Sequence, residues 1–198
     1  MVQSLADSVL VPMNYAHYLA LEAIDQHYFV DVRKKVKQEH PTFTNDFLDL
    51  GILYLKRYYA IHVLDPLNPP AMSLPLDPFW HSHILYSEDY FAFCNKVFGE
   101  YLHHIPLLFE DVVADQFVKS MYEHTYARHE EIFGTVDQTM FPKLDAKINP
   151  GETMGRCCSP KAAMRLQGFV DIALFAEDKL LKLMPGKARA FSEPKAEP

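Results

Sequence analysis

Five of the chain's 14 prolines fall within residues 64–78, and this segment constrains the fold more than any other part of the sequence. Proline lacks a backbone donor and breaks helices, so the segment must be an irregular connection. Apolar residues recur at helical spacing on both sides of it, and no run alternates as a half-buried strand does. The sequence therefore predicts an all-α, single-domain helical bundle that contains a proline-rich connection.

About five helices account for the periodic pattern of this 198-residue chain. We expect them at residues 13–39, 44–62, 77–98, 108–133 and 160–184. Asp77 and Pro78 are expected to supply an N-cap and a first-turn proline, and Gly99 a C-cap. Residues 1–184 would then form the helical domain, and residues 185–198 a disordered tail.

Charge, hydropathy and cysteine content limit the partners and the cellular compartment that we expect for the protein. The net charge of -7 argues against a nucleic-acid partner, and no apolar run is long enough to predict a membrane span. The first residues lack the basic and apolar regions of a signal peptide, and an odd number of cysteines (three) suits a reducing compartment. We therefore expect a cytoplasmic protein, and the sequence leaves its oligomeric state open.

Histidines concentrate immediately after the proline-rich connection. Four of the ten lie between residues 81 and 104, and Asp77 stands one helical turn before His81. Imidazole and carboxylate are common ligands of zinc, iron and copper. The sequence predicts a site for such a transition-metal ion, formed by Asp77, His81, His83 and His104 and supported by Trp80, Cys94 and His103.

Helix geometry sets conditions on this site. His81 and His83 lie about 200° apart on a regular helix, so both reach one ion only if the first turn is distorted. A helix over 77–98 is about 30 Å long. The five residues after Gly99 span at most about 17 Å, which disfavours a meeting of His104 with His81. A ligand from another helix is an equal alternative: His17, His27, His62, His124 or His129.

If the site is catalytic, the ion would activate water or oxygen, with Tyr90 or Glu88 handling protons, on a small molecule or peptide. Cys157 and Cys158 precede a predicted helix and follow Arg156, which favours reactive thiolates. These thiols provide a separate hypothesis, an enzyme that modifies a small peptide. A further alternative is a protein-interaction module in which the histidine cluster is structural.

Known metalloenzyme patterns exclude two classes. A ferritin-like bundle needs two Glu-x-x-His motifs, and only Glu100–His103 fits one. The His-Glu-x-x-His motif of zinc proteases is absent.

The string Asp-Pro-Phe-Trp-His-Ser-His at residues 77–83, together with His-Ile-Pro at residues 104–106, resembles the signature of the glycine-rich domain-containing protein-like family (the DUF1399 group). The resemblance covers about residues 45–158, in a short form without the glycine-rich tail, and departs from the family pattern at residues 71–75. It implies motif positions but no particular reaction. These positions are Asp77, Trp80, His81, His83, Tyr90, Cys94, Gly99, His104 and Pro106.

Overall fold

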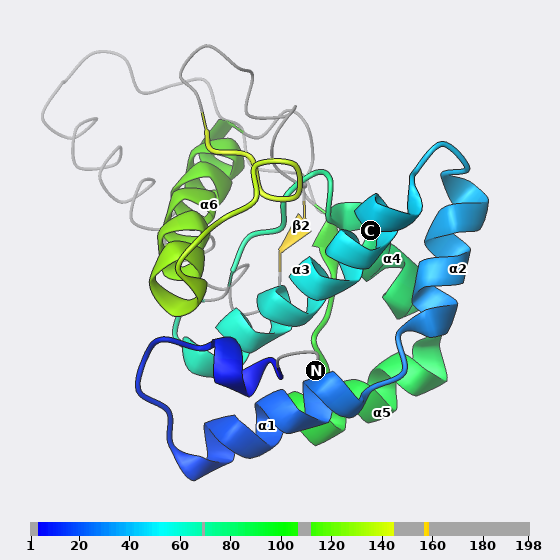
Figure 1. The fold of residues 1–198 in the computed structure, drawn as a ribbon. Helices are drawn as coiled ribbons and strands as arrows, with labels where there is room; N and C mark the ends of the chain where they lie inside the picture. The colour runs from blue at the N-terminus through cyan, green and yellow to red at the C-terminus, as the bar shows by residue number, and fades with distance from the viewer. Residues whose placement is uncertain (1–3, 69, 107–111, 145–156, 159–198) are drawn as a thin grey trace, which may run out of the picture. The chain divides into compact units, whose positions relative to one another are not determined.

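A computed structural model of the chain describes residues 4–68, 70–106, 112–144 and 157–158, all within one compact unit, Met1–Ala163 (Figure 1). Its elements, in chain order, are η1 (Ala6–Ser8), α1 (Tyr15–Gln26), α2 (Val30–Glu39), α3 (Asn45–Leu64), α4 (Asp77–Leu85), α5 (Ser87–Phe98), β1 (Ile105–Pro106), α6 (Val112–Phe133) and β2 (Cys157–Cys158). The predicted all-α class is confirmed, with six α-helices in the described part of the chain.

Helix α3 is the central element, in contact with α1, α2, α4 and α6 (Figure 1). It begins after Thr44, whose side chain accepts a hydrogen bond from the Phe47 amide at 3.2 Å, as expected for the predicted helix over 44–62. Gly51 lets α4 approach α3 closely, because a Cβ atom at this position would lie 2.0 Å from Cζ of Phe79. The position of α4 therefore depends on a glycine in the middle of α3.

Aromatic rings make up much of the core. The largest fully buried side chains include Trp80, Tyr58, Tyr59, Tyr90 and Phe79. The rings of Tyr58 and Trp80 pack 5.6 Å apart between centroids, and Tyr59 and Phe93 pack 4.8 Å apart. The first contact joins α4 to α3, and the second joins α5 to α3.

The predicted single helix over residues 13–39 is wrong, because the chain forms α1 and α2 with a break between them. His27 adopts an extended backbone conformation (φ -69°, ψ 141°) and ends α1. The break turns Phe29 into the core, where it is 4% exposed, and allows α2 to pack against α4. Tertiary packing outweighs the continuous helical pattern here.

The predicted helix over residues 77–98 is also divided, at Tyr86 (φ -83°, ψ 63°). Leu76, rather than Asp77, is the N-cap of α4, and Asp77 is the first helical residue. The predicted cap at Gly99 is confirmed, since Gly99 follows α5 in the left-handed conformation (φ 71°). The division allows α5 to turn back and pack against both α4 and α1.

Two short strands form the remaining regular structure of the described chain, β1 directly after His104 and β2 at Cys157–Cys158. Ile105 pairs with Cys158 and Pro106 with Cys157 in an antiparallel ladder. The predicted helix over 160–184 and the predicted tail over 185–198 lie outside the described residues. Within the described ranges, no helix combines the length and apolar composition that crossing a membrane requires.

Candidate metal centre

One cluster of potential metal ligands, here called the His83 group, consists of His27, His83 and Asp89. Its residues come from the ends of three helices. His27 caps α1, His83 lies in the last turn of α4, and Asp89 lies in the first turn of α5. The Nε2 atoms of His27 and His83 are 3.1 Å apart. Oδ2 of Asp89 lies 3.1 Å from the first and 3.7 Å from the second. Three potential ligand atoms therefore form a small triangle.

Aromatic rings enclose the inner side of the His83 group. The rings of Phe29 and Phe93 lie 5.2 and 5.0 Å from the His83 ring, and Tyr90 lies 4.9 Å from it. His83 is fully buried. Its Nδ1 atom is 2.8 Å from the hydroxyl of Tyr59, which fixes the orientation of the imidazole and leaves Nε2 facing the triangle.

The protonation states suit a cation. Burial lowers the pKa of His83 to about 3, and the nearby His27 contributes to the shift. Burial also lowers the pKa of His27, although the Asp89 carboxylate opposes this. Burial raises the pKa of Tyr59 well above its usual value, so this hydroxyl stays neutral. Near neutral pH both imidazoles of the group are therefore neutral. Neutral imidazole nitrogen and the carboxyl oxygen of an aspartate are good transition-metal donors.

The outer side of the His83 group is accessible. The side chain of Asp89 is 55% exposed and that of His27 is 13% exposed. A surface groove beside Asp89 is lined by Tyr86, Ser87, Glu88, Asp89 and Ala92. A cavity of about 250 Å³ is lined partly by His27, Phe29, Arg33 and Lys56. Small molecules can therefore approach two of the three ligand residues.

Asp77, His81 and His104, here called the His81 group, form a second cluster on the other face of α4. Nε2 of His81 and Nε2 of His104 are 2.7 Å apart, and Nδ1 of His81 is 3.5 Å from Oδ2 of Asp77. The His81 side chain is 48% exposed. Burial and the neighbouring His81 lower the pKa of His104.

A chain of hydrogen bonds positions the segment that carries His104. The indole nitrogen of Trp80 donates to the Tyr90 hydroxyl at 3.0 Å, and this hydroxyl donates to the carbonyl of Leu102 at 2.7 Å. Both rings are fully buried, and burial raises the pKa of Tyr90. The Trp80 ring also packs against His104, with 5.0 Å between centroids. Tyr90 therefore connects α5 to the segment after Gly99.

The chain matches one known family model over residues 20–147, which is more than half of its length. It belongs to the UCP032817-like family. No curated protein and no solved structure matches it. All six residues of the His83 group and the His81 group lie within the segment shared with the UCP032817-like family. The family description names no reaction or ligand, and the resemblance to the glycine-rich domain-containing protein-like family stays a prediction.

The four metal ligands predicted from the sequence lie in two separate clusters of the UCP032817-like protein rather than in one. Asp77, His81 and His104 come together, whereas His83 lies with His27 and Asp89. The expectation that His104 could hardly reach His81 is wrong. It assumed an unbroken helix, and the break at Tyr86 shortens the distance that the chain must span.

Asp89 is the ligand candidate that sequence reasoning missed. As part of Ser-Glu-Asp-Tyr it resembles an ordinary solvated helix residue. A serine followed by two acids is, however, a typical helix start, and it could have indicated the break before Ser87. His27 was among the alternatives, and its position just before the turn between α1 and α2 brings it to His83.

The remaining candidates lie outside both clusters. Glu88 is exposed on α5, and the exposed His103 packs against Tyr101 with 4.6 Å between ring centroids. Cys94 is buried, and burial raises the pKa of its thiol. The backbone of Cys157 and Cys158 pairs with β1, directly after His104, whereas their side chains lie outside the described atoms.

The other histidines have different surroundings. His124 pairs with Asp65 at 3.0 Å. His129 is buried and stacks on Tyr54. His17 and His62 line a separate cavity of about 200 Å³.

Proposed function

We propose that the protein binds one transition-metal ion at the His83 group and acts as a metal-dependent enzyme on a small molecule. The triangle of His27 Nε2, His83 Nε2 and Asp89 Oδ2 carries this proposal. A point equidistant from the three atoms lies about 1.9 Å from each, close to the bond length of about 2.1 Å that zinc or iron makes to such ligands. A cation at this point would contact all three donors without large movements.

The donor set supports an open site rather than a closed structural one. Two imidazoles and one carboxylate on one face leave coordination positions for water or substrate. An ion held in this way supplies Lewis acidity and can activate water or oxygen. The protein contributes an aromatic wall that excludes water from the inner side, and Tyr59 holds His83 in place. The groove beside Asp89 is the proposed entry for the small molecule.

A metal titration tests the binding step. Chelator-treated protein is titrated with Zn²⁺, and Asp89→Asn is expected to lower the affinity of one equivalent by at least about 100-fold. Asp46→Asn is the matched control, because Asp46 is also exposed in the first turn of a helix and belongs to neither cluster. If Asp89→Asn binds Zn²⁺ as the wild type does, the proposal is wrong.

The open positions can be tested separately. In protein loaded with Mn²⁺, the ion should enhance the relaxation of water protons, because exchangeable water occupies positions that the protein leaves free. Asp89→Asn should reduce this enhancement, and Asp46→Asn should not. A tightly bound ion without exchangeable water would contradict the enzymatic part of the proposal.

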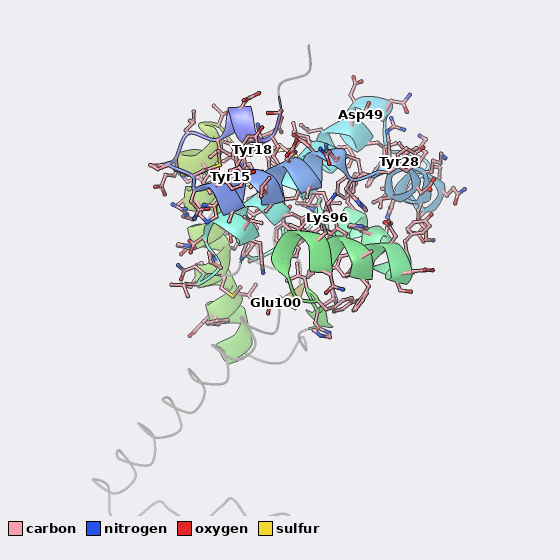
Figure 2. All side chains as sticks on the ribbon, turned by 90° about the horizontal axis from the view of Figure 1, so that it is seen from below. Tyr15, Tyr18, Tyr28, Asp49, Lys96 and Glu100 are labelled. Atoms are coloured by element: carbon pink, nitrogen blue, oxygen red, sulfur yellow. The ribbon has the colours of Figure 1, made fainter. Side chains whose placement is uncertain are left out.

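The alternative of an interaction module is supported by exposed apolar side chains on α1. Tyr15 is 76% exposed, Tyr18 46% and Leu19 45%, and Figure 2 shows the two tyrosines on this helix. Tyrosine is favoured at protein interfaces. If the His83 group binds no metal while Tyr15→Ser/Tyr18→Ser abolishes capture of a partner identified with wild-type protein, this alternative is preferred.

A further inference from the structure

The His81 group brings two imidazole nitrogen atoms face to face, next to a carboxylate. Nε2 of His81 and Nε2 of His104 face each other at 2.7 Å. Only one of the two can carry the shared proton, and Nδ1 of His81 is already directed at Asp77. If the shared proton moves to another ring nitrogen, the lone pairs of both Nε2 atoms face the space between the two rings, which are inclined at 66°.

We infer that His81 and His104, with Asp77, form a second metal site that clamps the segment after Gly99 onto the first turn of α4. This inference goes beyond the proposed function, because it concerns different residues on the other face of α4. The ion class is zinc or a similar divalent first-row cation, since the donors are imidazole nitrogen and carboxylate oxygen. Two ligands of a tetrahedral zinc ion lie about 3.3 Å apart, so the facing nitrogens need to separate by only about 0.6 Å.

Asp77 has a positioning role in this site. Its carboxylate is only 18% exposed and lies one turn before His81, 3.5 Å from Nδ1. A carboxylate that accepts from one ring nitrogen directs the other nitrogen at the metal and makes it more basic. Small movements would also allow this carboxylate to bind the ion directly, because the ligand atoms of the three residues lie within 4.8 Å of one another.

The clamp acts on a segment with little regular structure of its own. Residues 101–104 form no helix or strand, and they connect the cap at Gly99 to β1. The Tyr90 hydroxyl holds this segment at Leu102, and the ion would hold it two residues later, at His104. Because β1 begins at the next residue, the ion would also fix the start of the pairing with Cys157–Cys158.

Zinc stoichiometry tests the inference with a matched pair of variants. Wild-type protein should bind two Zn²⁺ ions, and His104→Ala should bind one. His103→Ala is the control, because His103 is the neighbouring residue, is exposed and lies outside both clusters. The inference is overturned if His104→Ala keeps two equivalents or if His103→Ala loses one in the same way.

The outcomes also separate this inference from the proposed function. If only the His83 group binds metal, the wild type binds one ion, Asp89→Asn binds none and His104→Ala is unchanged. If only the His81 group binds metal, His104→Ala binds none and Asp89→Asn is unchanged. The first outcome overturns the clamp alone, and the second overturns the proposed function alone.

Hydrogen exchange tests the clamping itself. Zn²⁺ should slow amide exchange in residues 101–104 by at least about tenfold, because the bound segment opens less often. His81→Gln should abolish this protection, and since His81 is half exposed the variant is expected to fold. Equal exchange with and without Zn²⁺ in wild-type protein that has bound two ions would contradict a clamp.

Discussion

The His83 group and the His81 group have the same composition, two histidines and one aspartate, but very different surroundings. The first unites helix ends from α1, α4 and α5 around a fully buried imidazole. The second joins residues of α4 to the segment that follows α5, and its central histidine is half exposed. The comparison teaches that burial, ring packing and a single tyrosine contact distinguish a candidate reaction centre from a candidate clamp.

The largest effect of a single substitution is expected from displacing α4, the helix that both groups share. Gly51→Ala places a Cβ atom against the buried ring of Phe79 and should displace α4, at a cost of about 2–3 kcal/mol in the free energy of unfolding. Urea unfolding measures this loss, and Zn²⁺ affinity should fall at both groups. The double variant Gly51→Ala/Phe79→Leu relieves the overlap. If it is no more stable than Gly51→Ala, the close approach is not the cause.

Acid should affect the buried histidines next most strongly. Burial lowers the pKa of both His83 and His129 to about 3, whereas an unfolded imidazole titrates near 6.5. The folded state keeps these two rings neutral, whereas the unfolded chain binds a proton at each ring below about pH 6.5. The free energy of unfolding is therefore undiminished above about pH 6.5 and decreases as the pH falls toward 3. At pH 5 each ring should account for about 2 kcal/mol of lost unfolding free energy.

The variant His129→Phe separates the two contributions. His129 belongs to neither group, and its ring nitrogens have no hydrogen-bond partner among the described residues. Phenylalanine keeps the ring contacts and cannot be protonated. Urea unfolding of chelator-treated protein between pH 7 and pH 5 should show a smaller loss for His129→Phe than for the wild type. Equal losses would mean that His129 does not titrate as its burial indicates.

Tyr59→Phe should sharpen the comparison at the His83 group alone. The substitution keeps the buried ring but removes the hydroxyl that contacts Nδ1 of His83. Loss of such an orienting contact typically lowers metal affinity about 10–100-fold. Zn²⁺ titration should show this loss for one equivalent, with the other unchanged. An unchanged affinity at both would show that ring packing alone orients His83.

Tyr90→Phe is the corresponding test at the His81 group, and its effect on Zn²⁺ affinity should be the smallest. It removes the hydroxyl that accepts from Trp80 and donates to Leu102, two residues before His104. The buried indole N–H of Trp80 and the carbonyl of Leu102 lose this partner, so we expect a loss of at least about 2 kcal/mol in the free energy of unfolding. Zn²⁺ affinity at the His81 group should fall only several-fold, because His104 itself is retained. A larger loss of Zn²⁺ affinity at the His83 group than at the His81 group would contradict the role of Tyr90 in positioning the segment that carries His104.

Local signals predicted much of the fold. Thr44 and Gly99 mark the ends of elements through their own hydrogen bonding and backbone preferences, so the sequence predicts the start of one helix near Thr44 and a helix end at Gly99. The breaks at His27 and Tyr86 contain no proline or glycine, and they arise because Phe29 and α5 gain tertiary contacts. The opposite orientation of His81 and His83 followed from helix geometry, whereas the partnership of His83 with Asp89 depended on a break that periodicity does not show.

The separation of His27 from His83 by 56 residues has a consequence for the N-terminal part of the chain. An ion shared by these residues would cross-link α1 to α4, much as a disulfide closes a long loop and restricts the unfolded chain. Chelation would open this link while leaving the aromatic core between α3 and α4 intact. Limited proteolysis would then first cut near residues 4–26. The rate of that cleavage would report the metal occupancy of the His83 group.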